Sequence, residues 1–202
     1  SSVSSSLSSG VSQLYSTDYA FAALKDDGSV VTWGYSADGG DSSSVSSSLS
    51  SDVSQIYSTA QAFAALKTDG SVVTWGYSDY GGDSSSVSSS LSSGVSQIYS
   101  NEYAFAALKT DGSVVTWGYS NFGGDSSNVS SSLSSGVSKI YSNTHSFAAL
   151  KDDGSVITWG DSRFGGDNSN NNELVPSGKL ISYGWQTSSD DNTWLEVGTN
   201  ST

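Results

Sequence analysis

The sequence predicts an all-β protein made of four copies of one small sheet, and three observations carry that prediction. A segment that ends at Gly34 returns three times, and the period is 42 residues each time. The segment holds β-branched and aromatic residues around an Asp-Gly pair, which is typical of two strands joined by a hairpin. Its apolar residues stand at consecutive positions, which indicates strands covered on both faces. A repeated unit of this length is typical of stacked or circular repeat proteins.

Each repeat contains three strand candidates in a row. The first begins at Val11, and its mixture of Val, Leu and Tyr favours a strand. Residues 21–24 and 30–31 give the second and third strands, and the Asp27-Gly28 pair between them readily takes the positive backbone dihedrals of a tight turn. Small sheets buried on both faces fit blades standing face to face around an axis better than a solenoid with one solvated wall. The sequence therefore predicts the blades of a β-propeller.

Serine-rich segments connect the repeats. The first holds Val3 and Leu7, and the same apolar pair recurs in each later copy, for example at Val45 and Leu49. The spacing of four residues suits one helical turn, although serine is a weak helix former that offers competing local hydrogen bonds. We interpret the segment as a compact connection between blades that inserts two apolar side chains. A disordered linker is the alternative, and the regular placement of the apolar pair weighs against it.

The fourth copy presents its residues in an order known from one family. It has NTHSFAAL over residues 143–150 and DGSVITWG over residues 153–160, and Gly165 and Gly166 follow. This order resembles the repeats of RCC1-type β-propellers, whose pattern is roughly G-x-x-H-x-x-A-L-x-x-D-G-x-V-x-x-W-G-x-N-x-x-G-Q-L-G. The resemblance covers residues 3 to about 167 and implies RCC1-like blades.

The copies also depart from that family's pattern. Their period is shorter, the histidine position holds Tyr19, Gln61 and Tyr103 in the first three copies, and serine stands in place of the asparagine after Trp-Gly. The RCC1 protein itself binds chromatin and acts as an exchange factor for a small GTPase, and no residue here carries either role over. Propellers of this type have about seven blades. Four repeats therefore predict an open arc or a partial ring, and we expect the chain to be part of something longer.

The chain is expected to have two parts. Residues 1–167 are the four tandem RCC1-like repeats, and residues 168–202 are an Asn-rich linker followed by a β-hairpin with strand candidates at 179–187 and 193–197. The hairpin resembles part of the Ig-like repeats of very long bacterial adhesins, where a tyrosine, a Trp-Gln pair and a Thr-Trp pair surround a Ser-Asp-rich turn. Its alternative role is a cap that covers the apolar face of the last repeat.

The amino-acid composition limits the classes of partner and the cellular locations that we expect for this protein. The formal charge is −13, with seven Lys and Arg against twenty Asp and Glu, and such a surface repels nucleic acid and anionic lipid. We therefore expect no nucleic-acid partner and no membrane insertion. Cysteine is absent, which excludes disulfides and thiolate metal sites. Repetitive, acidic, Ser- and Gly-rich composition without cysteine is common in secreted bacterial proteins, so we predict a secreted or cell-surface protein.

Two short positions vary among copies that are otherwise nearly identical. One follows the first strand and the other follows the third strand, so both belong to the same rim of the blades, opposite the Asp-Gly turns. Loops on a rigid scaffold commonly carry recognition, and these residue types suit contact with a sugar or a peptide. The candidate ligand-binding residues are Asp18, Tyr19, Gln61, Glu102, Tyr103 and His145 at the first position, and Asp38, Tyr80, Phe122, Arg163 and Phe164 at the second. Neutral drift of exposed loop tips is the alternative.

A Gly-Gly-Asp triplet in each copy suggests a metal ion. Calcium takes carboxylate and carbonyl oxygens from glycine-rich loops, so the candidate ligands are Asp41, Asp83, Asp125 and Asp167. No triplet has the spacing of an EF-hand or of a calcium-binding nonapeptide repeat. The alternative is that each carboxylate closes its own turn onto backbone N–H groups.

The function expected from these observations is non-enzymatic. His145 is the single histidine, and the sequence has no nucleophile elbow, zinc spacing or phosphate loop. The tryptophan of each copy stands beside a buried valine, which favours core packing over a stacking platform. We predict an adhesion or binding scaffold that presents its variable rim to a protein or carbohydrate surface. The alternative is a structural protein whose repeats assemble with other copies of the chain into rings or filaments.

Overall fold

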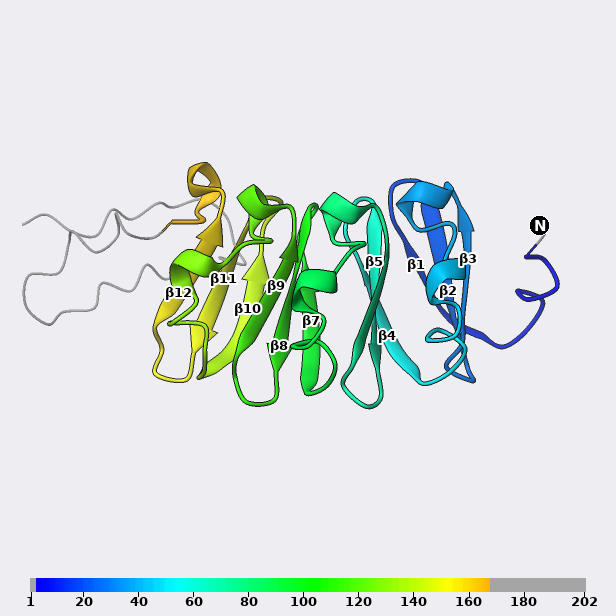
Figure 1. Ribbon diagram of the computed structural model, residues 1–202, viewed down its shortest axis with the longest axis horizontal. Coiled ribbons are helices and arrows are strands. Elements are labelled where there is room, and N and C mark those ends of the chain that lie inside the picture. The colour runs from blue at the N-terminus through cyan, green and yellow to red at the C-terminus, as the bar shows by residue number, and fades with distance from the viewer. Residues whose placement is uncertain (1–2, 168–202) are drawn as a thin grey trace, which may run out of the picture. The chain divides into compact units, whose positions relative to one another are not determined.

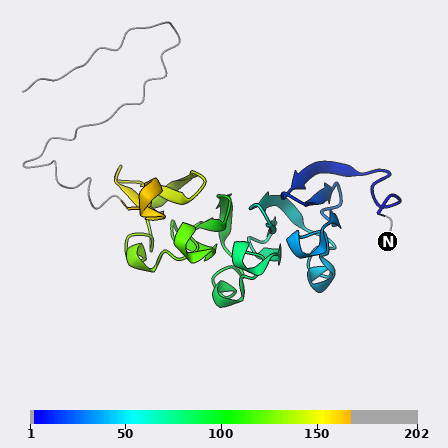
Figure 2. The same ribbon diagram turned by 90° about the horizontal axis from the view of Figure 1, so that it is seen from above.

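The computed structural model describes residues 3–167, which form four three-stranded antiparallel sheets (Figure 1). All of these residues belong to one compact unit, Ser1–Asn170. Within this unit the sheets follow one another in an open row that does not close into a ring (Figure 2). The predicted linker and hairpin at 168–202 lie outside the described residues.

Each sheet has its strands in sequence order, so that one repeat is one blade. The strands are β1 (Val11–Ser16), β2 (Ala20–Lys25) and β3 (Val30–Gly34); β4 (Val53–Ser58), β5 (Ala62–Lys67) and β6 (Val72–Gly76); β7 (Val95–Ser100), β8 (Ala104–Lys109) and β9 (Val114–Gly118); β10 (Val137–Ser142), β11 (Ser146–Lys151) and β12 (Val156–Gly160). The predicted all-β fold of four blades in an open array is confirmed, because the three strand candidates pair antiparallel in every copy.

Short 3-10 helices complete each repeat. Four follow the third strands: η1 (Ser36–Asp38), η3 (Ser78–Tyr80), η5 (Ser120–Phe122) and η7 (Ser162–Phe164). Three lie in the serine-rich connections: η2 (Ser43–Val45), η4 (Ser85–Val87) and η6 (Ser127–Val129). Among residues 3–167 no helix is long and apolar enough to cross a membrane.

The central strands are buried on both faces, as their consecutive apolar residues predict. Ala20, Ala22 and Leu24 of β2 pack against Phe63 and Ala65 of β5 in one hydrophobic core. Because alternate residues of a strand point to opposite faces, the first set faces the following blade and the second set faces the preceding one. The same core recurs between the second and third blades and between the third and fourth.

A stacked phenylalanine and tryptophan anchor each of these interfaces. Phe63 pairs with Trp75 across β5 and β6, with 5.2 Å between ring centroids. The indole Nε1 of Trp75 donates a hydrogen bond to the carbonyl of Gly39 in the preceding repeat, at 3.1 Å. Gly39 has φ of +99°, and a Cβ there would stand 2.5 Å from the ring of Phe63, so only glycine fits. The expected core role of the tryptophans is thereby explained.

The Asp-Gly turns lie on the rim of the blades opposite the two variable positions, at the lower edge in Figure 1. Lys25 N donates to Ser29 O at 2.9 Å, and Gly28 has φ of +76°. The sequence predicts positive dihedrals for the Asp-Gly pair, but only the glycine adopts one, because the turn spans three residues instead of two. Asp27 Oδ1 accepts the N–H of Ser29 at 3.0 Å and also its hydroxyl.

The serine-rich connections are ordered segments, as predicted, and each inserts its two apolar side chains. Leu49 is buried in the core between the first and second blades, and Val45 packs against the same core. The N–H of Leu49 donates to the carbonyl of Val45 at 3.2 Å, which is the single helical turn that the spacing of four residues suggests.

Candidate ligand-binding rim

The two variable positions of each repeat lie together on one rim. The N–H of Tyr35 donates to the carbonyl of Tyr19 at 2.9 Å, and the hydroxyl of Thr17 donates to the carbonyl of Asp38 at 3.1 Å. The turn after the first strand is thus bonded to the segment after the third strand, as the meander predicts.

Neighbouring repeats are also bonded along this rim. The N–H of Asp18 donates to the carbonyl of Ala60 at 2.8 Å, and the N–H of Ala60 donates to the carbonyl of Glu102 at 2.9 Å. These bonds use backbone atoms alone, so the side chains at the same positions are free to differ. The rim is a rigid base for variable side chains.

Seven aromatic side chains form a continuous series over the second, third and fourth repeats, which we name the aromatic row. It consists of Tyr77, Tyr80, Tyr103, Tyr119, Phe122, His145 and Phe164. Ring centroids are 5.3 Å apart for Tyr80 and Tyr103, 4.5 Å for Tyr103 and Phe122, and 4.4 Å for His145 and Phe164. Each contact is within the range of attractive aromatic pairs, so the rings hold one another in place.

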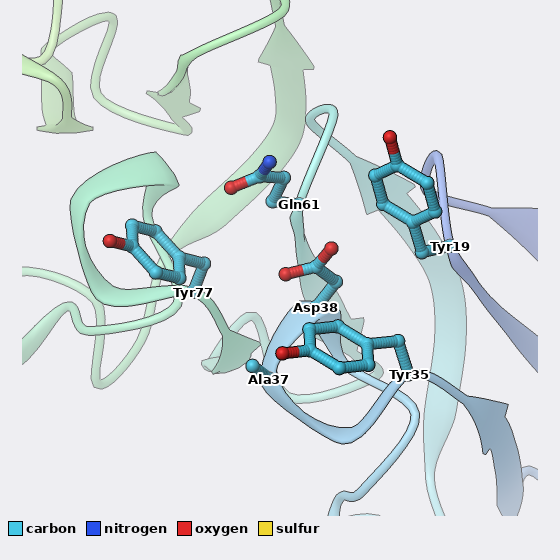
Figure 3. A pocket seen from close by; sticks show the side chains of 6 residues that line it. All are labelled: Tyr19, Tyr35, Ala37, Asp38, Gln61 and Tyr77. Atoms are coloured by element: carbon cyan, nitrogen blue, oxygen red, sulfur yellow. The ribbon is translucent and has the colours of Figure 1, made fainter.

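A hollow takes the place of the aromatic row between the first and second repeats. It has a volume of about 660 Å³ and is lined by Tyr19, Tyr35, Ala37, Asp38, Gln61 and Tyr77. Figure 3 shows the carboxylate of Asp38 in the middle of the hollow, with the tyrosines and the amide of Gln61 around it. Residues from both variable positions therefore meet here.

Carboxylate side chains lie next to the aromatic rings of the rim, and their environments shift several pKa values. A side-chain hydrogen bond with Glu102 holds the pKa of the Tyr103 hydroxyl above its usual range. Burial, and secondarily the nearby charge of Asp18, raises the pKa of Asp38. In the fourth repeat Asp161 pairs with Arg163, with 2.7 Å between Oδ2 and Nη2, and this hydrogen-bonded pair lowers the pKa of Asp161.

The structure divides the eleven predicted rim residues into three groups. Five belong to the aromatic row: Tyr80, Tyr103, Phe122, His145 and Phe164. Three line the hollow: Tyr19, Asp38 and Gln61. Arg163 lies over the ring of Phe164 and pairs with Asp161, while Asp18 and Glu102 are exposed beside the rings. Their role in binding stays a prediction.

Sequence reasoning missed Tyr35, Tyr77 and Tyr119, which are exposed on the same rim. They are identical in three copies, whereas the search for candidate binding residues used the positions that vary between copies. The signal that could have found them is a large aromatic residue directly after Trp-Gly, beyond the end of the buried strand.

Three of the four Gly-Gly-Asp carboxylates form the hydrogen bonds that their alternative role requires. Asp41 Oδ1 accepts the N–H of Ser43 at 2.9 Å, and Asp83 and Asp125 accept the equivalent N–H groups at 2.8 Å. The bond from Ser43 lowers the pKa of Asp41. In residues 3–167 no three Asp, Glu or His side chains come together as a metal-binding group. Calcium binding by Asp41, Asp83, Asp125 and Asp167 stays a prediction.

No family model and no curated protein matches this chain. Among solved structures, human WBSCR16 is similar, with 24% identity and a TM-score of 0.46 over 74% of this chain and 47% of that chain. Prp20p from Saccharomyces cerevisiae has 20% identity and a TM-score of 0.49 over 74% of this chain and 43% of that chain. Yeast RCC1 (Prp20) bound to Kap60 has 21% identity and a TM-score of 0.49 over 74% and 42%. The chain spans less than half the length of each of these proteins.

Proposed function

We propose that the chain is a non-enzymatic binding scaffold of a secreted or cell-surface protein and that it adheres to a protein or carbohydrate surface through the variable rim. The observation that carries this proposal is the aromatic row, which spans three repeats. Three of its members are exposed and the other four are half-buried, so their ring faces and edges remain open to a partner. Rigid aromatic side chains supply contact area at a low cost in conformational entropy.

The position of the row supports recognition rather than packing. The core rings, such as Phe63 and Trp75, are buried between blades, whereas the row lies above them on the rim. Exposed aromatic residues grouped in one patch mark interaction sites more often than isolated ones do. Carboxylates at Glu102 and Asp18 beside the rings add hydrogen-bond acceptors for hydroxyl or amine groups of a partner.

The test removes rings from the row. A variant with Tyr80, Phe122 and Phe164 all changed to Ala is compared with the unchanged chain for binding to glycan arrays, protein arrays and intact bacterial cells. The matched control changes Thr68 and Thr110 to Ala, which are exposed at the opposite rim. We expect the first variant to lose binding and the control to keep it. Equal binding by both variants would refute the rim as the binding surface.

A second candidate function, assembly between copies, is favoured by the two end faces of the row of blades. Phe21 in the first blade is 48% exposed, whereas its counterpart Phe63 is 0% exposed. Leu14 is 64% exposed, whereas its counterpart Ile56 is 1% exposed. Within residues 3–167, the face of the first blade that holds Leu14 and Phe21 is therefore open. In every later blade, the preceding blade covers the same face.

Within the part of the chain that the structure describes, the last blade leaves open the complementary half. A Cβ added at Gly165 would meet nothing within 4 Å, whereas at Gly39 it would meet the ring of Phe63. On the first blade, the indole of Trp33 has no hydrogen-bond acceptor within residues 3–167, whereas Trp75 bonds to Gly39 of the preceding repeat. The occupant that fits both faces is a second copy of this chain, because the same interface forms three times inside one copy.

Light scattering tests this assembly. The single chain has a mass of 20.8 kDa, and we expect multiples of this mass for the unchanged protein. Phe21→Asp should return the protein to a monomer, and Phe164→Asp should not, although Phe164 is 47% exposed on the rim. A monomeric unchanged protein would refute assembly through these faces.

A further inference from the structure

The hollow between the first two repeats exists because one aromatic ring is replaced. Asp38 stands where the later repeats have Tyr80, Phe122 and Phe164. In the second repeat this ring reaches the next repeat, since the centroids of Tyr80 and Tyr103 are 5.3 Å apart. Phe122 and His145 repeat the contact at 5.0 Å. An aspartate is too short to make it, and the space of about 660 Å³ remains open.

The carboxylate in this space lacks a partner. Asp38 is only 5% exposed, and its side chain forms no hydrogen bond with any residue of 3–167. Its oxygens are not sealed from water, since neither is among the fully buried side-chain atoms without a partner, but the negative charge of Asp18 nearby makes it costly to keep both carboxylates ionised. The hollow has none of the Lys or Arg residues of 3–167 in its lining. A positive charge that enters from outside would therefore be attracted and would relieve this cost.

The walls of the hollow suit the same kind of ligand. Three tyrosines, Tyr19, Tyr35 and Tyr77, surround the carboxylate, and Gln61 supplies an amide (Figure 3). The faces of aromatic rings attract cations, and groups of such rings bind alkylated ammonium ions. A volume of about 660 Å³ is within the range of small-molecule sites. Rings, carboxylate and size all favour an organic cation over a neutral sugar or an anion.

We propose that this hollow is a binding site for an alkylammonium group, with Asp38 as the counter-charge and Tyr19, Tyr35 and Tyr77 as the surrounding rings. The proposal rests on the binding role of the rim and assigns a ligand class to one part of it. An alkylammonium group occurs in free choline-like quaternary ammonium ions and in the side chain of lysine. The two sources share the chemistry that the hollow recognises.

The test is a calorimetric titration with three probes. Choline and Nα-acetyl-lysine methylamide carry the positive charge on a free quaternary ammonium ion and on a lysine side chain, respectively. The probe 3,3-dimethylbutan-1-ol has the shape of choline without its charge. We expect at least one cation to bind at least about tenfold more tightly than the neutral probe, and the stronger of the two cations identifies the source. Equal binding of the neutral probe, or binding of neither cation, overturns the proposal.

Variants test the location of the site. Asp38→Asn should weaken cation binding at least about tenfold, and Asp38→Phe should abolish it, because it fills the hollow as Phe122 does in the third repeat. The matched control is Asp79→Asn, an exposed carboxylate in the second repeat, which should bind like the unchanged chain. If Asp38→Phe fails to fold, Tyr35→Ala replaces it, with Tyr141→Ala as its control, because Tyr141 is an exposed tyrosine outside both the hollow and the aromatic row. Unchanged binding by the Asp38 variants overturns the proposal.

The proposed adhesion and this proposal fail in different ways. Adhesion depends on the rings at Tyr80, Phe122 and Phe164, none of which lines the hollow. Loss of adhesion in that triple variant together with no cation binding would refute the cation site alone. Cation binding that survives while the triple variant adheres normally would refute the aromatic row as the adhesive surface and leave the hollow in place.

Discussion

The two rims of the blades differ in how their repeats touch one another. At the Asp-Gly rim, a Cβ on Gly28 would stand 2.8 Å from the backbone N of Asp52 in the next connection. At the variable rim, Asp18 and Ala60 meet the following repeat through backbone N–H and carbonyl groups. The first kind of contact forbids substitution and the second permits it. The four copies therefore vary at positions where a change of side chain has little effect on the stability of the fold.

The layer directly beneath the variable rim should be the most sensitive part. Phe105 is 0% exposed, stacks on Trp117 at 5.2 Å and lies against Gly81 of the preceding repeat. Phe105→Ala should lower the free energy of unfolding by about 3–5 kcal/mol, the usual cost of removing a buried phenylalanine. Denaturant unfolding measures it, with Phe164→Ala as the exposed control. A similar loss in both variants would contradict the distinction between the layer and the surface above it.

Substituting two glycines at the Asp-Gly rim distinguishes the cost of a packing overlap from the cost of backbone strain. Gly70 and Gly154 have φ of +77° and +83°, but a Cβ on Gly70 would stand 2.9 Å from Gly94 N, whereas one on Gly154 meets nothing within 4 Å. Gly154→Ala should cost about 1–2 kcal/mol for the left-handed backbone. Gly70→Ala should cost ~1–3 kcal/mol more for the overlap with the next repeat. Equal losses in the free energy of unfolding of the two variants, measured with denaturant, would show that the contact between Gly70 and the next repeat does not contribute to stability.

The sequence predicts the parts of this architecture that are local. Strand positions, burial on both faces and the shared rim all follow from residues within one 42-residue unit. The aromatic row and the hollow depend on side chains one repeat apart, such as Phe122 and His145, whose contact requires the spacing between blades. The hydrogen-bond acceptor of the Trp75 indole could not be predicted from the sequence either, because a backbone carbonyl such as that of Gly39 has no sequence signature.

Acid should weaken the turns of the Asp-Gly rim. A side-chain hydrogen bond from Ser29, and then the bond from the Ser29 N–H, lowers the pKa of Asp27, and the other three turns repeat this. Because the folded-state pKa is below the unfolded value of about 3.9, the stability from these turns is present above pH ~4 and is lost as the pH falls through the folded pKa. Changing Asp69 and Asp111 to Asn should flatten this decline in thermal midpoints between pH 5 and 2. An unchanged pH profile would assign the decline to other carboxylates.

The smallest effect is expected from exchanging residues between copies at the variable rim. Glu102→Thr places the residue of the fourth repeat in the third, and the bond from Ala60 N–H to the backbone carbonyl at 102 does not involve the side chain. The free energy of unfolding should change by no more than about 0.5 kcal/mol, as for ordinary exposed positions. Because Glu102 bonds to Tyr103, we expect partner binding to change while stability does not. A loss above about 1 kcal/mol in denaturant unfolding would mean that rim side chains hold the blades together, and the contrast between the two rims would then fail.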